Sequence, residues 1–331
     1  MYDTVKIVKT EIDFNDINKD QFRSISDINN NVISANRTIR INEDDKSHSQ
    51  TIYLSYIGKY RSLSATFSIP NLLYGSNIYE FNLEEDKNRL LTLLNYHIRD
   101  IVNVDVRKWR ISRLDICKNI ELDIPTQQVI HSLIINSFTQ SKSKGKKTYN
   151  SAVVFNDKTE TFQIYDKIES EKHFEYEIPE SFEDKNILRI ENQIKNNEGL
   201  KAPLRFGKEL KLKDIFKPQI VRKSKQILLE NFYRNYGNII IKNDLISIGR
   251  DVEKEYGNKG LFEKVVILNQ FKNEIINLDE LDRLFKVFYS KRQLMRKRNE
   301  LRRLYDFYNN NIALNTGFNL YDKVKSELGV K

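Results

Sequence analysis

The chain has 331 residues, which is enough to bury a sizeable core and predicts two domains. Charged residues make up 31% and apolar residues 39%, a balance that predicts a globular protein and excludes a disordered one. The formal net charge of +9 favours an anionic partner, nucleic acid before a membrane surface. A basic protein that binds no polyanion is the alternative.

Several classes of protein are excluded by what the sequence lacks. Cys117 is the single cysteine, so an internal disulfide framework and a thiolate metal cluster are impossible, and we expect a small, partly buried thiol there. No apolar run reaches membrane-spanning length and Met1-Tyr2-Asp3 does not begin a signal peptide, so we expect an intracellular protein with no membrane partner. The absence of a glycine-rich phosphate loop argues against a P-loop NTPase or a Rossmann dehydrogenase.

The first hundred residues predict strands and then a helix. Residues 5–8 form a short strand that leads into residues 15–48, which are rich in Asn, Asp and Ser and which we expect to be a long loop. Residues 51–57 and 61–69 alternate around Gly58-Lys59-Tyr60, which predicts a hairpin. From residue 85 the apolar residues recur at helical spacing, which predicts an amphipathic helix of about four turns.

The next hundred residues alternate between strand and helix patterns. We expect strands at 111–116, 151–155, 161–167 and 187–192, a second helix after Pro125, and a basic loop at 141–147. This order predicts an α+β fold, an antiparallel sheet with helices on one face and an open polar face opposite.

The last third of the chain has few strand patterns, so we predict two domains: residues 1–205 with the sheet, and a mostly helical DNA-binding domain over 206–331. One predicted helix, which follows a possible capping box at Ser290, combines an apolar face with a basic outer arc. The arc contains Arg292, Arg296, Arg298, Arg302 and Arg303. This pattern fits a helix-turn-helix placed against DNA, with a solvated charged face as the alternative.

Three of the predicted strands carry reactive side chains on one face. By alternation these are Arg113 with Asp115, Tyr165 with Lys167, and Arg189 with Glu191. A phenol can attack a DNA phosphorus and keep the energy of the broken bond in a phosphotyrosyl link. Because the transition state gains negative charge, such a site needs a cation or a metal ion beside it. The combination therefore predicts phosphodiester transfer.

We assign a role to each of these residues. Tyr165 is the nucleophile, and Lys167 lowers the pKa of its phenol or contacts the phosphate. Asp115 and Glu191 are hard oxygen ligands for Mg²⁺ or Mn²⁺. The predicted DNA contacts are the two strand arginines and the lysines of the basic loop: Arg113, Arg189, Lys144, Lys146 and Lys147. The alternative is a structural one, with a packed tyrosine and ordinary cross-strand ion pairs.

These stretches together resemble the gene II/gene X replication proteins of filamentous phages and related plasmid-type initiators. The similar segments are ISRLD at 111–115, FQIYDK at 162–167, LRIE at 188–191 and SIPNLLYGSN at 68–77, in the same order, within a similarity that covers about residues 50–220. The resemblance implies a divalent-metal-dependent, site-specific endonuclease and strand transferase that starts rolling-circle replication. It implies Tyr165 as nucleophile and acidic positions at Asp115 and Glu191; no His-hydrophobe-His metal motif is present, so carboxylates would supply most ligands.

The hypothesis is therefore a rolling-circle initiator that acts on a plus-strand origin with a host helicase and polymerase, in the cytoplasm of a bacterial host. One alternative is an origin-binding initiator without nuclease activity, in which the basic helix does the work. A second is a relaxase or transposase of similar chemistry, which the sequence does not distinguish. An RNA-binding protein is a further alternative, although no aromatic-rich RNA-recognition strand motif is present.

Overall fold

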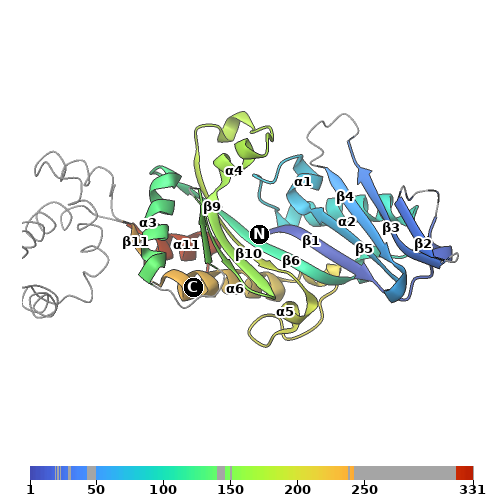
Figure 1. Ribbon diagram of the computed structural model, residues 1–331. Coiled ribbons are helices and arrows are strands. Elements are labelled where there is room, and N and C mark those ends of the chain that lie inside the picture. Colours follow the sequence, from blue (N-terminus) through green and yellow to red (C-terminus); the bar gives the residue numbers. More distant parts are fainter. Residues whose placement is uncertain are drawn as a thin grey trace, which may run out of the picture.

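The computed structural model describes residues 1–18, 20, 22, 24–28, 31–42, 50–139, 146–149, 151–237, 239–241 and 318–330. Ten of the described strands form one sheet in the order β2-β3-β4-β5-β1-β6-β10-β9-β8-β7, with neighbouring strands antiparallel (Figure 1). Most of the described helices cover one face of this sheet, and one short helix, α4 (Lys167–His173), packs on the other. The predicted α+β class with an antiparallel sheet is confirmed.

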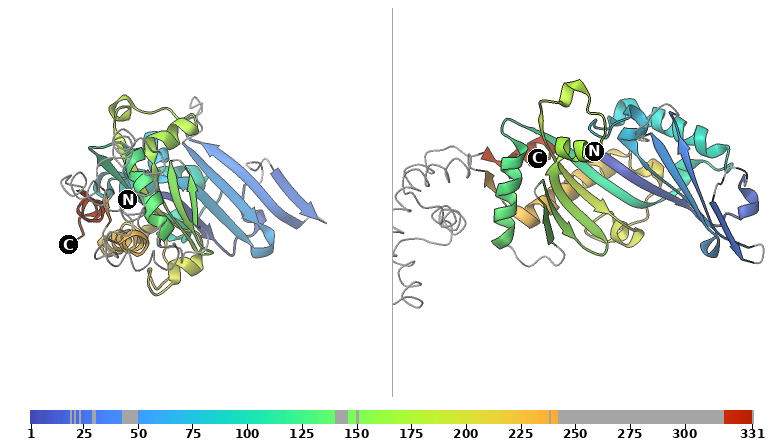
Figure 2. Two further views of the ribbon diagram at one scale, coloured as in Figure 1. Left: turned by 60° about the vertical axis from the view of Figure 1, so that its left-hand side comes forward. Right: turned by 45° about the horizontal axis from the view of Figure 1, so that its top comes forward.

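The N-terminal half of the sheet contains five strands. They are β1 (Tyr2–Lys9), β2 (Ser24–Ile28), β3 (Asn31–Arg40), β4 (Thr51–Ile57) and β5 (Ser62–Ser68). The predicted hairpin is confirmed: β4 and β5 pair directly across a short 3-10 turn at Gly58–Tyr60, and Arg61 closes the turn with φ 43°. These strands extend to one side of the molecule (Figure 2).

The prediction of a long loop over residues 15–48 is wrong, because β2 and β3 lie inside this segment. Its Asn and Ser residues have low strand propensity, but pairing and burial override propensity in a sheet. Ala35 pairs with Tyr56 and Ile39 pairs with Ile52, and all four side chains are buried. The neighbouring strand β4 therefore decides the structure of this polar segment.

The C-terminal half of the sheet contains the other five strands. They are β6 (Arg110–Leu122), β7 (Lys146–Tyr149), β8 (Ala152–Asn156), β9 (Glu160–Asp166) and β10 (Asn186–Ile194). The four predicted strands are confirmed, with one correction at a strand end and one to the predicted basic loop. The predicted strand at 161–167 ends at Asp166, and the predicted basic loop at 141–147 overlaps the start of β7 at Lys146.

The described helices are α1 (Ile69–Tyr74), α2 (Leu83–Arg99), α3 (Thr126–Thr139), α4 (Lys167–His173), α5 (Asn197–Lys201), α6 (Pro218–Tyr236) and α11 (Leu320–Leu328). The helices predicted from residue 85 and after Pro125 are confirmed as α2 and α3, whereas α1, α4, α5 and α11 were not predicted. The backbone N–H of Glu84 donates to the Asn82 side chain, which caps α2, and acidic residues in the first turn favour its start. None of the described helices combines the length and apolarity needed to span a membrane.

The core lies between the apolar face of the sheet and helices α2, α3, α6 and α11. Leu114 of β6, Ile190 of β10 and Phe232 of α6 belong to the same buried cluster. Helices α6 and α11 follow the domain boundary predicted after residue 205, yet both pack into this core, and a two-stranded ladder of β11 (Ile240–Ile241) with β12 (Phe318–Asn319) adjoins them. The boundary stays a prediction, since residues 242–317 lie outside the described part.

The second face of the sheet is polar, and its two halves differ. Over β9 and β10 it is covered by α4 and by residues 76–82, where Ile78, Ile168 and Ile187 form a small apolar cluster. Over β3, β4 and β5 no described element lies in front of it in Figure 1, where helix α2 lies behind these strands. Tyr53 is 52% accessible there, while the smaller Thr51, Ser62 and Ser64 are buried within the same face. We call these regions the covered half and the open half. The candidate site lies where they meet.

Candidate active site

Strand register brings the predicted site residues of three strands onto the polar face. Arg189 pairs with Tyr165 of β9, and Gln193 pairs with Asp115 of β6. Glu191 lies between them on β10. Because directly paired residues in antiparallel strands project to the same face, these side chains form one group.

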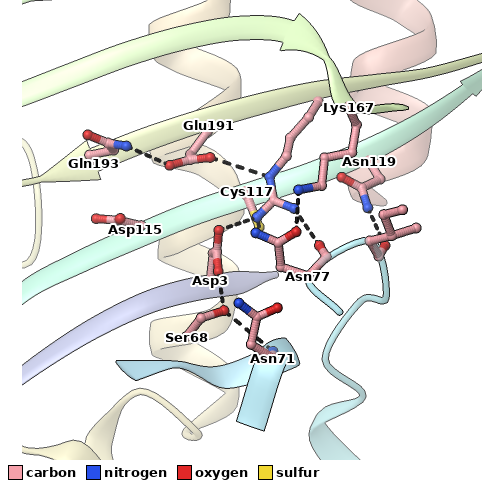
Figure 3. Close-up of polar contacts among 12 residues, drawn as sticks. Asp3, Ser68, Asn71, Asn77, Asp115, Cys117, Asn119, Lys167, Glu191 and Gln193 are labelled. Atoms are coloured by element: carbon pink, nitrogen blue, oxygen red, sulfur yellow. Dashed lines mark hydrogen bonds and ion pairs between the residues drawn. The ribbon is translucent and has the colours of Figure 1, made fainter. Parts of the chain in front are cut away.

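Glu191 is the centre of this group. Its Oε2 accepts a hydrogen bond from the Tyr165 hydroxyl at 3.0 Å and lies 3.3 Å from Nε of Arg189. Its Oε1 accepts a hydrogen bond from the Gln193 amide at 2.8 Å (Figure 3). The side chain is 4% exposed. A carboxylate held from two directions in this way has a fixed orientation toward the tyrosine.

Arg189 is buried, which corrects its predicted role as a DNA contact. Its side chain is 1% exposed, and its guanidinium donates to Oδ2 of Asp3 at 2.6 Å and to the backbone carbonyl of Asn77 at 2.7 Å. It also lies 3.1 Å from the sulfur of Cys117. Helix α4 and residues 76–82 cover this end of the face, so Arg189 binds the carboxylates of the protein itself.

Asp3 is a site residue that the sequence analysis missed. It comes from β1, it is buried, and the Ser68 hydroxyl donates to its Oδ1 at 2.6 Å (Figure 3). The β1–β6 register shifts between Tyr2 and Val5, and such bulges re-aim side chains. An acidic residue at the start of an alternating strand was the available signal, but alternation alone does not predict the bulge.

Asp115 and Arg113 form a bidentate pair on β6. The guanidinium of Arg113 donates to the two carboxylate oxygens at 2.9 and 2.5 Å. Asp115 is 1% exposed while Arg113 is 35% exposed, so the arginine still faces solvent. Burial raises the pKa of Asp115 to about 8, an effect that Arg113 opposes and that the nearby Glu191 and Asp3 carboxylates reinforce.

Tyr165 carries a protonated phenol at rest. Its side chain is half-buried, and burial followed by the charge of Glu191 raises its pKa well above the usual value. Arg189 opposes this shift. A phenol with such a pKa needs a base to remove its proton, and the Glu191 carboxylate is within hydrogen-bond distance.

The predicted role of Lys167 is also corrected. Asp166 caps α4 by accepting from the backbone N–H of Glu169, so the chain turns into a helix and Lys167 leaves the strand alternation. Its side chain is 1% exposed, and its ammonium lies 2.5 Å from Glu171 and donates to Asn77. Burial lowers the pKa of Lys167, and the positive charge of Arg189 lowers it further. Lys167 therefore supports the covered half of the face.

The remaining predicted residues are placed only in part. Lys147 is exposed on β7, in a row that runs through Val154 and Gln163 to Glu191. The backbone of Lys146 begins β7, but its side chain lies outside the described part. Also outside it are Lys144 and the five arginines of the C-terminal basic arc, Arg292, Arg296, Arg298, Arg302 and Arg303. Cys117 is buried, more fully than the partly buried thiol that was expected, and burial raises its pKa to about 11.

The acidic residues of the polar face are the candidate ligands for a metal ion. Among the described residues, no group of three or more His, Cys, Asp or Glu side chains is placed to hold one. Mg²⁺ is commonly bound by one or two carboxylates, with water and substrate phosphate completing its shell. Asp115 and Glu191 are diagonal neighbours on the same face of β6 and β10, so these two carboxylates would suit a site of this kind.

Comparison with known families identifies the family of this chain. The family model for the N-terminal region of the gene II replication-associated protein of filamentous phages matches residues 1–213. The chain belongs to this family. The match confirms the resemblance to gene II replication proteins and extends it back through β1, which contains Asp3. A search of curated proteins found no match. The protein is thus a replication-associated protein.

Proposed function

We propose that this protein nicks and rejoins single-stranded DNA at a replication origin through a phosphotyrosine on Tyr165, and so starts rolling-circle replication. The observation that carries the proposal is the hydrogen bond of 3.0 Å from the Tyr165 phenol to Glu191, next to Asp115 and at the edge of the open half. Membership in a family of replication-associated proteins supports DNA as the substrate. A host helicase and polymerase would act on the nicked product.

The proposed step is a phosphoryl transfer with balanced bonds. The Tyr165 oxygen attacks the scissile phosphorus while Glu191 accepts the phenolic proton. The phosphorus–oxygen bond to the 3′ carbon breaks, and the leaving oxygen takes a proton from water to give a free 3′-OH. The product is a 5′-phosphotyrosyl ester, so the energy of the broken bond is kept. Attack of a 3′-OH on this ester reverses the step and closes the circle.

Other residues stabilise and orient the reacting groups. Mg²⁺ or Mn²⁺ held by Asp115 and Glu191 would neutralise charge that develops on the phosphoryl oxygens. Arg113 holds Asp115 and is exposed enough to meet a DNA phosphate. Arg189 is a positioning residue, because its contacts with Glu191 and Asp3 set where both carboxylates lie.

The test is a nicking assay on supercoiled DNA that carries the cognate origin, with Mg²⁺ or Mn²⁺. The parent should produce nicked circles and a covalent 5′ adduct, and Tyr165→Phe should produce neither. Tyr96→Phe is the matched control, since Tyr96 is an exposed tyrosine on α2, away from the site. Equal nicking by the parent and Tyr165→Phe would remove Tyr165 from the mechanism.

A second candidate is an origin-binding initiator without nuclease activity. It is favoured by one observation: the carboxylates of Asp3, Asp115 and Glu191 are all already bonded within the chain, as in a structural network. No nicking by the parent together with intact origin binding would select this candidate.

A further inference from the structure

The open half of the polar face carries a row of side chains that leads to the candidate site. Strand register pairs Thr38 with Tyr53, Tyr53 with Thr66, Thr66 with Lys6, and Lys6 with Arg113. These five residues come from five neighbouring strands and share one face, and we call them the open row. Neighbouring strands lie about 4.8 Å apart, so the open row is about 19 Å long.

Most side chains around the open row are uncharged hydrogen-bonding groups. The accessible or partly accessible side chains on the same face of β1, β5, β4 and β3 are Thr4, Val8, Ser34, Asn36, Arg40, Ser55, Ile57 and Ser68; Thr51, Ser62 and Ser64 share the face but are buried. Apart from Asp3, which Arg189 neutralises, the described side chains of this face include no acid, although the chain has 46. Hydroxyl, amide and basic groups of this kind bind phosphate and sugar oxygens. The face therefore suits a polyanion.

Aromatic side chains are exposed on this otherwise hydrophilic surface. Tyr53 is 52% exposed in the middle of the open row, and Ile57 on the same strand is 39% exposed. At the margin of the face the rings of Phe174 and Tyr176 lie 6.0 Å apart. Burial raises the pKa of Tyr176, and the charges of Glu171 and Tyr53 add to the shift, which places this pair near the open row. Exposed rings stack on unpaired bases whatever the sequence.

The open row ends at the candidate site. Lys6 makes no ion pair with any residue in the described ranges. Arg113, the last member, holds Asp115, and Asp115 pairs with Gln193, which donates to Glu191. A nucleic-acid strand bound along the open row would thus reach the hydrogen-bonded group that contains the Tyr165 phenol.

We propose that single-stranded DNA crosses the open row, with a base stacked on Tyr53 and phosphates at Lys6 and Arg113, before it enters the site. This inference rests on the proposed function, since it names the path by which the substrate reaches Tyr165. Duplex DNA buries the faces of its bases in its own stack, so it offers nothing for Tyr53 to stack on.

The test measures binding of a fluorescent oligothymidylate of about 12 nucleotides, a length within the usual site size, to the full-length Tyr165→Phe protein by anisotropy. Tyr53→Ala should weaken binding by between about 5-fold and 100-fold, and Tyr53→Phe should keep the parent affinity. Lys6→Gln should lower the slope of log affinity against log salt by about one. Because Tyr53 is half exposed, Tyr53→Ala should fold normally.

Tyr96→Ala is the matched control and should bind like the parent. Tyr96 is 71% exposed on α2 and borders a groove of about 970 Å³ between α2 and residues 103–107, on the helix-covered side of the sheet. An equal loss of affinity in Tyr96→Ala would indicate that the oligonucleotide binds in this groove and would overturn the proposal. Parent affinity in Tyr53→Ala would also overturn it, as would an equal effect of Tyr53→Ala on a duplex of the same length.

This experiment is separate from the test of the proposed function. The oligonucleotide is not cut, so binding along the open row needs no nicking activity. Absence of nicking by the parent would refute the phosphotyrosine mechanism and leave the open row standing. Normal nicking with parent affinity in Tyr53→Ala would refute only the open row.

Discussion

The covered half and the open half of the polar face have the same alternating sequence pattern and opposite surroundings. In the covered half, Arg189 and Lys167 are each 1% exposed and are paired with carboxylates. In the open half, Tyr53 and Thr38 are exposed and the charged groups are few. The covering by α4 and residues 76–82 turns charged strand residues into a closed network. Where no described segment covers the face, its side chains stay accessible, and this is the surface that we propose for single-stranded DNA.

The largest effect is expected for Arg189→Met. It removes a buried guanidinium and leaves Asp3 and Glu191 as neighbouring buried carboxylates without their cation, which should cost about 3–5 kcal/mol of unfolding free energy. Urea unfolding followed by circular dichroism measures it. Lys147→Gln, an exposed change on the same face, is the control and should stay within about 0.5 kcal/mol. A loss below about 1 kcal/mol would contradict a closed network in the covered half.

Lys167→Met should cost somewhat less, about 3 kcal/mol, because Glu171 is left buried without its partner. The double variant Lys167→Met with Glu171→Gln should regain most of this loss, since no charge is then left unpaired. Urea unfolding of the parent, both single variants and the double variant completes the cycle. Nicking by the double variant at the parent rate would agree with a structural role for Lys167. Loss of nicking in a double variant that has regained its stability would indicate that Lys167 takes part in the reaction.

Asp115→Asn should change how stability depends on pH. The pKa of Asp115 is about 8 in the folded protein and near 3.8 when unperturbed, so the folded state binds the proton more tightly. The stabilisation that the folded state gains from this tighter proton binding is fully present below about pH 4. It is lost as the pH rises to about 8, by at most about 1.4 kcal/mol per pH unit. Unfolding between about pH 5 and pH 8.5 with a chelator should therefore show the parent losing stability relative to Asp115→Asn. Parallel curves would contradict the raised pKa.

The smallest effects are expected in the open half. Thr38→Ala and Tyr53→Ala remove exposed side chains that pack on no core residue of the opposite face, so each should change the unfolding free energy by about 0.5 kcal/mol or less. Thermal or urea unfolding measures both. A loss of more than about 2 kcal/mol at Tyr53 would mean that this half is built for stability and would remove the contrast with the covered half.

How much of the site followed from the sequence can be seen residue by residue. Alternation correctly placed Asp115, Glu191 and Tyr165 on one face, because neighbouring side chains in a strand always point to opposite sides. Alternation failed at Lys167, because the strand ends one residue earlier than predicted and the capping carboxylate of Asp166 starts a helix that the pattern did not predict. It also failed for Asp3, whose direction depends on a bulge in the β1–β6 pairing.

The sequence by itself determined the family, the α+β class and most of the strands, because these depend on local periodicity and on motifs that each occupy a few residues. Tertiary structure alone decided that β2 and β3 form in a polar segment, and that Arg189 is buried while Tyr53 is exposed. The physical reason is the same in each case. Periodicity tells which residues share a face, but the segments that pair with that face or cover it lie far away in the chain.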